Sequence, residues 1–305
     1  MIRRSLEMIR SECLPFGVES NQIERYKEYY DLQMKDCEHH YGYIQVAGYN
    51  LFVQQFKPSI YTKTVFLIHG YLDHAASLSK AIRKLVDNHY EVIVYDLPGH
   101  GLSSGERMSV NSFDDYFETA KGLYDFFFSH GGETPYLVAH STGGAIALHL
   151  VRNKQARFSK MVLVAPLFRP YLWKTSTLGL FLTKPFIKNI KRVYSRNSSD
   201  EEYLAFTKLD PLQEKVLPLS WLYALGDWLK AELEEKQEDI SFLMIQGSRD
   251  KTIDVAFGEK KVMSMYPNSQ IVRMDEGSHQ LFNEESVVRN QTFYVMLKYL
   301  KDQRR

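Results

Sequence analysis

The sequence has few cysteines and no long apolar run. Its two cysteines, Cys13 and Cys37, precede the first strand pattern and lie far from any metal-ligand spacing, so we expect neither a disulfide framework nor a metal site. No stretch of about 18 apolar residues occurs, which excludes a transmembrane helix. Basic residues near the start are not followed by an apolar segment, which argues against a secretory signal and for a cytoplasmic protein.

The sequence also lacks an excess of charge of either sign. Its 38 Lys and Arg residues and 37 Asp and Glu residues give a net charge of +1. This argues against nucleic acid as a partner, because proteins that bind it usually carry a strong basic excess. With 44% apolar and 25% charged residues, the composition is that of a globular protein. A length of 305 residues allows one large α/β domain with an insertion, or two ordinary domains.

The stretch Tyr136–Gly144 is the most informative part of the chain. Residues 136–139 are typical of a buried strand and residues 143–153 of an amphipathic helix, so Ser141 falls on the turn between them. A serine on such a turn takes a strained backbone conformation, and this is where a nucleophile would lie. From this stretch alone, the alternative is a helix that begins with Ser or Thr as its cap.

Residue size around Ser141 favours the nucleophile. The strand and the helix crowd the positions two before and two after the serine, and these are Ala139 and Gly143, both small. The usual pattern is G-x-S-x-G, and alanine at its first position adds only a Cβ. The turn also directs backbone N–H groups of the helix start, beginning with Thr142, at an oxygen beside the serine.

Apolar segments along the chain predict eight strands, most of which alternate with helices. Strands are expected at 41–46, 51–56, 65–69, 92–95, 136–139, 161–165, 242–246 and 270–274, and helices at 21–37, 77–88, 113–129, 143–153 and 287–300. The first two strands should form a hairpin with its turn at 48–50. Continuous apolar strands alternating with helices predict an α/β fold, a mostly parallel eight-stranded sheet with helices on both faces.

This alternation divides the chain into four parts. Residues 1–40 are mostly polar and are expected to be an N-terminal extension that packs on the core or frays. Residues 41–165 and 241–305 are expected to form the two parts of the core. Residues 166–240 contain no buried-strand pattern, so we expect them to lie outside the sheet as an insertion.

Two late strands are followed by the side chains that a nucleophilic serine needs, a base and an acid. In an open parallel sheet, functional residues gather beyond the carboxyl ends of the strands. Asp250 follows the strand at 242–246 and His279 follows the strand at 270–274. Asp254 and Asp275 are alternative choices for the acid. The sequence therefore predicts a catalytic triad of Ser141, Asp250 and His279.

Two other histidines lie close in sequence to the predicted site. His140 precedes the serine directly, but we expect it to point elsewhere in the turn. His69 ends the third strand, and we expect it to brace the following loop through hydrogen bonds.

These motifs together resemble the α/β-hydrolase superfamily, in which the triad follows the order Ser, Asp, His. The matching segments are His69-Gly70, Asp96–Gly105, the Ala-His-Ser-Thr-Gly-Gly turn, Gly247–Asp250 and Ser278-His279-Gln-Leu. The Asp96–Gly105 loop with Glu106-Arg107 after it, and Asp73-His74, are similar to the bacterial lysophospholipase and monoacylglycerol lipase-like branch. The resemblance covers residue 41 to the end, apart from the insertion.

The resemblance implies further features of the site. The backbone N–H groups of Tyr71 and Thr142 would form the oxyanion hole, and residues 166–240 would be a helical cap after the sixth strand. It also implies acyl transfer through Ser141, with His279 as the base and Asp250 holding the imidazole. No cofactor or metal is needed for this chemistry.

The expected function is a serine carboxylester hydrolase for a lipid-like monoester, such as a lysophospholipid or monoacylglycerol. A thioesterase, a peptidase, a C–C bond hydrolase or a non-catalytic binding protein on the same scaffold are the alternatives. Residues 169–196 mix aromatic and aliphatic side chains with Lys and Arg and contain no acid, which suits a peripheral contact with the inner face of a membrane. The other interpretation is that these residues dock the cap on the core. The oligomeric state is left open.

Overall fold

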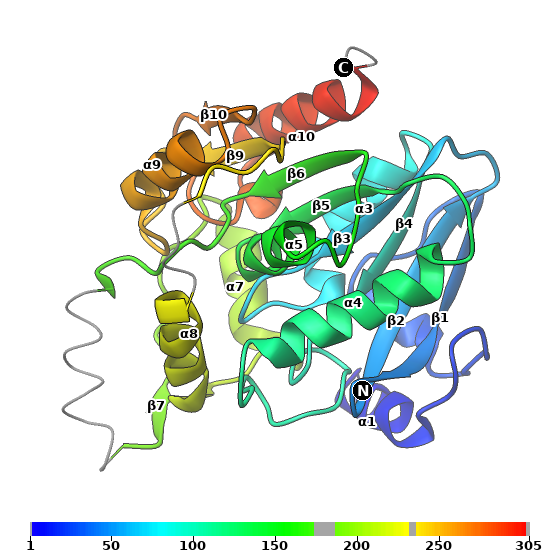
Figure 1. Ribbon diagram of the computed structural model, residues 1–305. Coiled ribbons are helices and arrows are strands. Elements are labelled where there is room, and N and C mark those ends of the chain that lie inside the picture. The colour runs from blue at the N-terminus through cyan, green and yellow to red at the C-terminus, as the bar shows by residue number, and fades with distance from the viewer. Residues whose placement is uncertain (1, 174–186, 232–235, 303–305) are drawn as a thin grey trace.

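An eight-stranded sheet forms the centre of the protein in a computed structural model, which describes residues 2–173, 187–231 and 236–302 (Figure 1). The strand order is β1-β2-β4-β3-β5-β6-β9-β10. Their bounds are β1 Cys37–Val46, β2 Tyr49–Pro58, β3 Lys63–Ile68, β4 Tyr90–Tyr95, β5 Tyr136–His140, β6 Lys160–Val164, β9 Leu243–Gly247 and β10 Gln270–Met274. Strand β2 is antiparallel to β1 and β4, and the other pairs are parallel. The predicted mostly parallel eight-stranded sheet is confirmed.

Helices cover both faces of the sheet, because successive side chains of each buried strand point to opposite sides. Val65 and Leu67 of β3 belong to one apolar cluster, whereas Phe66 and Ile68 belong to the other. The first cluster includes residues of α1 (Ile2–Glu12), α2 (Ile23–Tyr29), α3 (Ser79–Val86) and α10 (Ser286–Lys301). The second includes residues of α4 (Asp114–Phe128), α5 (Thr142–Arg152), α8 (Ser220–Ala231) and α9 (Val255–Met265). Short 3₁₀ turns lie at η1 (Ala75–Leu78) and η2 (Leu281–Asn283).

The N-terminal segment differs from the expected single helix at 21–37. Helix α2 ends at Tyr29, and Asp31 takes a positive φ of 53°, which is incompatible with continuing an α-helix. Strand β1 then begins at Cys37, inside the segment expected to be an extension. Helix α1 was not predicted, yet it buries Leu6 and Ile9 against the core. Residues of this segment therefore pack on the core.

The turn of the first hairpin is tighter than expected. Val46 pairs directly with Tyr49, so the turn residues are Ala47 and Gly48 and not 48–50. Both have positive φ, 48° and 83°, as a two-residue hairpin turn requires.

The predicted insertion leaves the sheet after β6 and returns at β9 (Figure 1). Its described part holds β7 (Asn189–Lys191), α7 (Glu201–Leu209), β8 (Val216–Pro218) and α8. Strands β7 and β8 pair antiparallel and are mostly exposed, which explains why the sequence shows no buried-strand pattern there. Part of the predicted apolar and basic run, residues 174–186, and the acidic residues Glu232, Glu234 and Glu235 lie outside the described residues.

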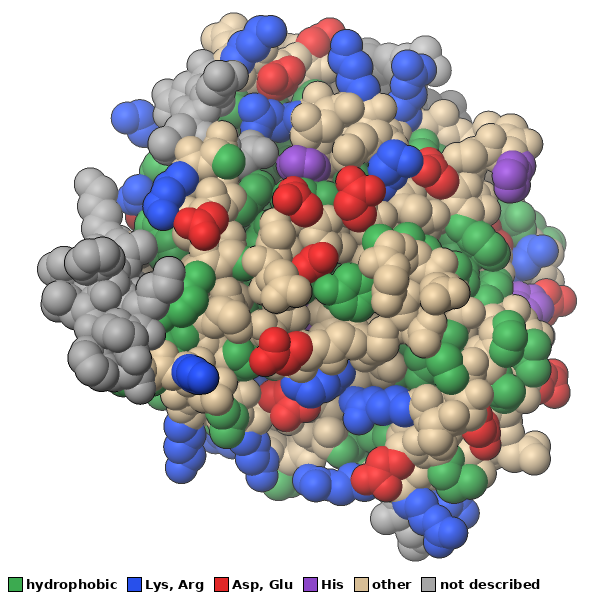
Figure 2. All heavy atoms as spheres, turned by 60° about the horizontal axis from the view of Figure 1, so that its bottom comes forward, with side chains coloured by type: hydrophobic (Ala, Val, Ile, Leu, Met, Phe, Trp, Pro, Cys, Tyr) green, Lys and Arg blue, Asp and Glu red, His purple; other side chains and the backbone are tan. Residues whose placement is uncertain are grey.

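The surface carries charges of both signs. Figure 2 shows Lys and Arg interspersed with Asp and Glu on the face that it presents, as expected from the small net charge. No helix in the described ranges has the length and apolar character needed to cross a membrane.

Candidate active site

Ser141 lies at the sharp turn between β5 and α5. Its φ of 51° and ψ of −116° are unusual for a residue with a side chain. The backbone of Ser141 is held from two sides, because its N–H donates to the Val164 carbonyl at 3.0 Å and its carbonyl accepts from Leu167 N at 3.0 Å. These bonds come from β6 and from the residues just beyond it, so the central sheet itself maintains the strained turn.

Close contacts with neighbouring backbone and side-chain atoms explain why the residues around the turn are small. A Cβ on Gly143 would lie 2.5 Å from the Ile68 carbonyl oxygen, and a Cβ on Gly70 would lie 2.9 Å from the Cβ of Ser141. Ala139 is fully buried in the sheet. The loop after β3 and the start of α5 can approach the serine this closely only because Gly70 and Gly143 lack side chains.

Ser141, His279 and Asp250 form a chain of hydrogen bonds. The Ser141 hydroxyl lies 3.0 Å from Nε2 of His279, and Nδ1 of His279 lies 2.7 Å from Oδ2 of Asp250. Thr252 N–H donates to the other carboxylate oxygen at 2.8 Å, and the Gln246 amide donates to Oδ2 at 3.0 Å. Ser141, His279 and Asp250 are all buried.

The environment of Asp250 keeps its carboxylate charged. Burial acts to raise the pKa of Asp250, but the adjacent His279 imidazole and the hydrogen bonds from Thr252 and Gln246 outweigh burial and lower this pKa below its usual value. An ionised Asp250 accepts the Nδ1 proton of His279 and thereby leaves Nε2 as the acceptor for the serine hydroxyl.

The two alternative acids lie elsewhere. Asp254 caps the N-terminus of α9 by accepting from Phe257 N–H, and it also pairs with Arg169 at 2.6 Å. Asp275 is exposed at the end of β10. Of the three candidates, only Asp250 contacts His279.

His140 and His69 support the site without reaching the serine hydroxyl. His140 Nε2 lies 3.1 Å from the carbonyl oxygen of His279, and burial together with the nearby His279 lowers the pKa of His140 to about 4. A neutral His140 can donate this bond and hold the backbone of His279. His69 accepts from Leu97 N–H at 2.9 Å through Nε2, so its Nδ1 donates to the Gly70 carbonyl at 2.8 Å. Both roles agree with the expectations from the sequence.

The two amides expected for an oxyanion hole lie on the same side of the site as the serine. Tyr71 follows Gly70, which packs against Ser141, and Thr142 is the first residue of α5. Amides in the first turn of a helix have no acceptor within the helix, so Thr142 N–H is available to a ligand. The Tyr71 ring stacks on Trp221 of α8 with centroids 3.6 Å apart, which links this loop to the insertion.

The Asp96–Gly105 motif has a structural role. The buried Asp96 carboxylate accepts from Ala75 N–H at 2.7 Å and from Leu102 N–H at 2.7 Å. Gly101 has φ of 47°, and a Cβ there would lie 2.1 Å from the Asp96 carboxylate. The motif thus anchors the loop after β3 to the loop after β4, and it contributes no side chain to the triad.

Glu284 contributes to the site although the sequence did not indicate it. This fully buried carboxylate accepts from Ser278 N–H at 2.5 Å and from Ser199 N–H at 2.6 Å. It therefore connects the loop that carries His279 to the insertion. No local pattern distinguishes it from Glu285, because the connection depends on a segment distant in the sequence.

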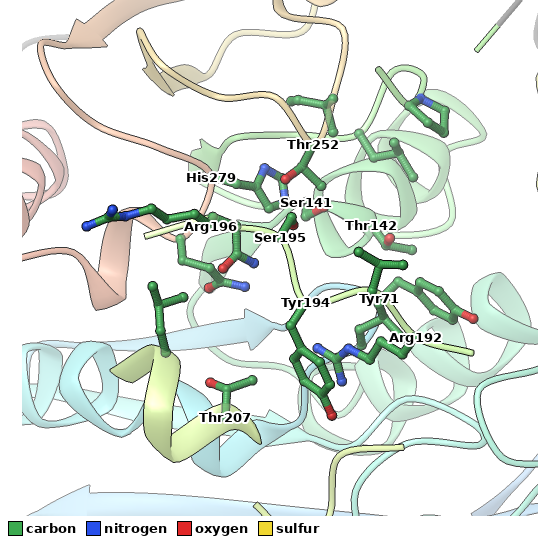
Figure 3. A pocket seen from close by; sticks show the side chains of 18 of the residues that line it. Tyr71, Ser141, Thr142, Arg192, Tyr194, Ser195, Arg196, Thr207, Thr252 and His279 are labelled. Atoms are coloured by element: carbon green, nitrogen blue, oxygen red, sulfur yellow. Dashed lines mark hydrogen bonds between the residues drawn. The ribbon is translucent and has the colours of Figure 1, made fainter. Parts of the chain in front are cut away.

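A cavity of about 420 Å³ opens next to Ser141 and His279. Figure 3 shows these two side chains at one side of the cavity, with Arg192 and Tyr194 of the insertion across from them. Apolar lining residues include Leu167, Trp221, Leu222 and Ile253. Within the part of the chain that the structure describes, no group of three or more His, Cys, Asp or Glu side chains could hold a metal ion.

Comparison with known proteins identifies the family. A model of the family described as serine aminopeptidase, S33, matches residues 61–286. The chain belongs to this family. Monoglyceride lipase of Mus musculus is 26% identical over 255 residues, which cover 79% of this chain and 83% of the lipase. Phospholipase YtpA of Bacillus subtilis is 22% identical over 231 residues, which cover 72% of this chain and 88% of the phospholipase.

Solved structures show the same fold. A soluble variant of monoglyceride lipase from Saccharomyces cerevisiae, in complex with a substrate analogue, matches with a TM-score of 0.76 and 19% identity over 88% of this chain and 95% of the lipase. Monoacylglycerol lipase from Paleococcus ferrophilus matches with a TM-score of 0.68 and 18% identity, over 82% of this chain and 98% of that lipase. The α/β-hydrolase fold predicted from the motifs is confirmed, as is the resemblance to the lipase and phospholipase branch.

Proposed function

We propose that the protein is a serine carboxylester hydrolase that cleaves a lipid-like monoester, a lysophospholipid or a monoacylglycerol. The observation that carries this proposal is the hydrogen-bonded chain from Ser141 through His279 to Asp250, which opens on a cavity with an apolar wall. Ser141, His279 and Asp250 are its catalytic residues, and residues 166–240 are its cap. Membership of a serine hydrolase family supports the reaction class.

The proposed reaction has two halves. In the first, Ser141 Oγ attacks the ester carbonyl carbon while His279 Nε2 takes the hydroxyl proton, and the oxyanion accepts hydrogen bonds from the N–H groups of Tyr71 and Thr142. The bond to the alcohol then breaks as His279 returns the proton to the leaving oxygen. In the second half, His279 takes a proton from water, the hydroxide attacks the acyl carbon, and Ser141 leaves with the proton restored.

Two observations support a lipid-like substrate. The relatives that cover most of the chain include monoglyceride lipases and a phospholipase. The apolar wall of the cavity, made by Leu167, Trp221, Leu222 and Ile253, suits an acyl chain.

A peptidase is the second candidate, because the family is described as serine aminopeptidase. A panel of esters, thioesters and aminoacyl amides that share one acyl group separates the candidates, and we expect the highest kcat/KM with the esters. A fluorophosphonate probe distinguishes any of these enzymes from a binding protein. The probe should label Ser141 in the folded protein, and an unlabelled Ser141 would rule out serine catalysis.

We also propose that the cap contacts a membrane surface. Val193 and Leu209 in the insertion are 86% and 76% exposed, and Lys188, Lys191 and Lys215 are exposed near them in sequence. Apolar side chains flanked by lysines suit an interface with anionic lipid. Binding to vesicles of anionic lipid should exceed binding to neutral vesicles and weaken at high salt. Equal binding to anionic and neutral vesicles, at both low and high salt, would rule out the proposed membrane contact. A cytoplasmic location stays a prediction.

A further inference from the structure

The wall of the catalytic cavity carries a cation that the proposed ester hydrolysis does not use. Arg192 directly follows β7 and is half-buried, and its backbone N–H donates to the Lys215 carbonyl at 2.9 Å. Figure 3 shows its guanidinium pointing into the cavity beside Tyr194, across from Ser141. The position of Arg192 follows from the pairing of β7 with β8, so its backbone is fixed.

The guanidinium of Arg192 is held on one edge and open on the other. Its Nη1 donates to the side-chain oxygen of the buried Gln213 and lies 3.5 Å from the Glu214 carbonyl oxygen. The Tyr194 ring lies 4.7 Å from the guanidinium carbon. Nε and Nη2 make no hydrogen bond to any described residue. Neutral groups thus orient the guanidinium of Arg192 and leave its Nε–H and Nη2–H groups to donate to a ligand.

No carboxylate of the described residues lies within 4.0 Å of the Arg192 guanidinium. The neighbouring Glu214 pairs with Arg107 at 3.1 Å. The cavity wall also includes Arg196, which Figure 3 shows pointing away from the cavity and which pairs with Glu201. Lys208 lies on the same wall, exposed and without an ion pair to any described residue. Among the described residues, Arg192 and Lys208 therefore leave two positive charges in the cavity lining without an ion pair.

The cavity has two chemically different walls. Leu167, Trp221 and Ile253 belong to one buried apolar cluster, and Leu222 packs against it. The segment after β7 and α7 present Arg192, Lys208 and the polar Thr207 to the cavity, together with Val193, Tyr203 and Leu204. An ester bound at Ser141 would direct its acyl chain to the apolar wall and its alcohol portion to the charged one.

Resting on the ester hydrolase proposed above, we propose that Arg192 selects substrates whose leaving alcohol carries a phosphate group. The substrate class is then an anionic lysophospholipid and not a neutral monoacylglycerol. The open edge of Arg192 offers two parallel N–H donors, which match two oxygens of one phosphate. Lys208 adds a second charge, which suits a phosphate monoester with its charge of about −1.5 to −2 at neutral pH.

The test compares two soluble esters that differ only in the phosphate, 1-hexanoylglycerol and 1-hexanoylglycerol 3-phosphate, at one fixed ionic strength. The wild-type protein should show the higher kcat/KM with the phosphorylated ester. In Arg192→Met, kcat/KM for that ester should fall by about 10- to 100-fold, because hydrogen bonds to charged groups are lost, while kcat/KM for the neutral ester stays near wild type. Arg192→Lys should retain part of the preference, since it keeps the charge and loses the fork.

Lys260→Met is the matched control. Lys260 is exposed on α9 and does not line the cavity, so its loss changes the net charge equally without changing the site. The preference for the phosphorylated ester should persist in this variant. An equal kcat/KM for both esters in the wild type, or an equal loss for both in Arg192→Met, would overturn the role of Arg192. Hydrolysis of neither ester, with Ser141 unlabelled by fluorophosphonate, would instead overturn the ester hydrolase itself.

Discussion

The described part of the protein contains two buried pairs of histidine and aspartate with nearly the same N–O distance. His279 Nδ1 lies 2.7 Å from Asp250, and His74 Nε2 lies 2.8 Å from Asp210. In both pairs the carboxylate also accepts a backbone N–H two residues further along, from Thr252 in one and from Leu212 in the other. The two carboxylates are therefore held alike, although the two histidines use different ring nitrogens.

The difference lies in what the second imidazole nitrogen faces. His279 Nε2 meets the Ser141 hydroxyl at the wall of the cavity. His74 Nδ1 is buried and has no hydrogen-bond partner among the described residues. Asp210 is held further by the Tyr30 hydroxyl at 2.7 Å, so this pair ties the N-terminal segment and the loop after β3 to the insertion. The geometry of the first pair suits proton transfer, whereas the second pair holds three segments together.

The largest effect should come from removing the group that His279 faces. Ser141→Ala leaves the His279–Asp250 pair intact but without a nucleophile, and kcat should fall about 10⁶-fold, as in other triads. Steady-state ester hydrolysis measures this loss, and the urea unfolding midpoint should stay near that of the wild type. Substantial remaining turnover would mean that another residue is the nucleophile.

The two aspartates should differ in their effect on catalysis. Asp250→Asn keeps the size of the side chain but favours the wrong tautomer of His279, so kcat should fall about 10⁴-fold. Asp210→Asn is the matched variant at the other pair, and its effect on kcat, corrected for the folded fraction, should be far smaller. Equal losses in the two variants would show that the comparison between the pairs is wrong.

The second pair should matter most for stability. His74→Ala leaves the Asp210 carboxylate buried without its charged partner, which should cost about 3–5 kcal/mol of unfolding free energy. Urea denaturation followed by circular dichroism measures this. His40→Ala is the control, because His40 is exposed on β1 and its removal should change stability little. A stability close to wild type in His74→Ala would contradict a structural role for the pair.

The smallest expected effect is the pH dependence of that stability. Burial acts to lower the pKa of His74, but the Asp210 carboxylate outweighs it and raises this pKa above its usual value. Burial acts to raise the pKa of Asp210, but His74 and the Tyr30 hydroxyl outweigh it and lower this pKa.

The sign of the effect follows from these two directions. Below the ordinary histidine pKa of about 6.5, the contribution of His74 is fully present, and it is lost as the pH rises through the raised pKa. At the acid end, the contribution of Asp210 is lost as the pH falls through its lowered pKa. The difference in unfolding free energy between wild type and Asp210→Asn should therefore shrink on both sides of this window. A difference that is constant with pH would show that the pair is not ionised.

The sequence alone was sufficient for the sheet and for the three residues of the hydrogen-bonded chain. Buried parallel strands are continuous apolar runs, and the loops that follow them meet at one edge, so Asp250 and His279 could be selected from their positions after β9 and β10. The turn at Ser141 was visible because its constraint is local, in the small residues on either side.

Only the tertiary structure revealed the other contributors. Helix α1, the buried Glu284, the pair of His74 with Asp210 and the orientation of Arg192 all depend on segments that are far apart in the chain. A polar residue in a loop looks the same in the sequence whether it is solvated or buried against a distant partner. Burial and contacts between distant segments arise only when the chain packs, and they decide which of the two His–Asp pairs faces the Ser141 hydroxyl.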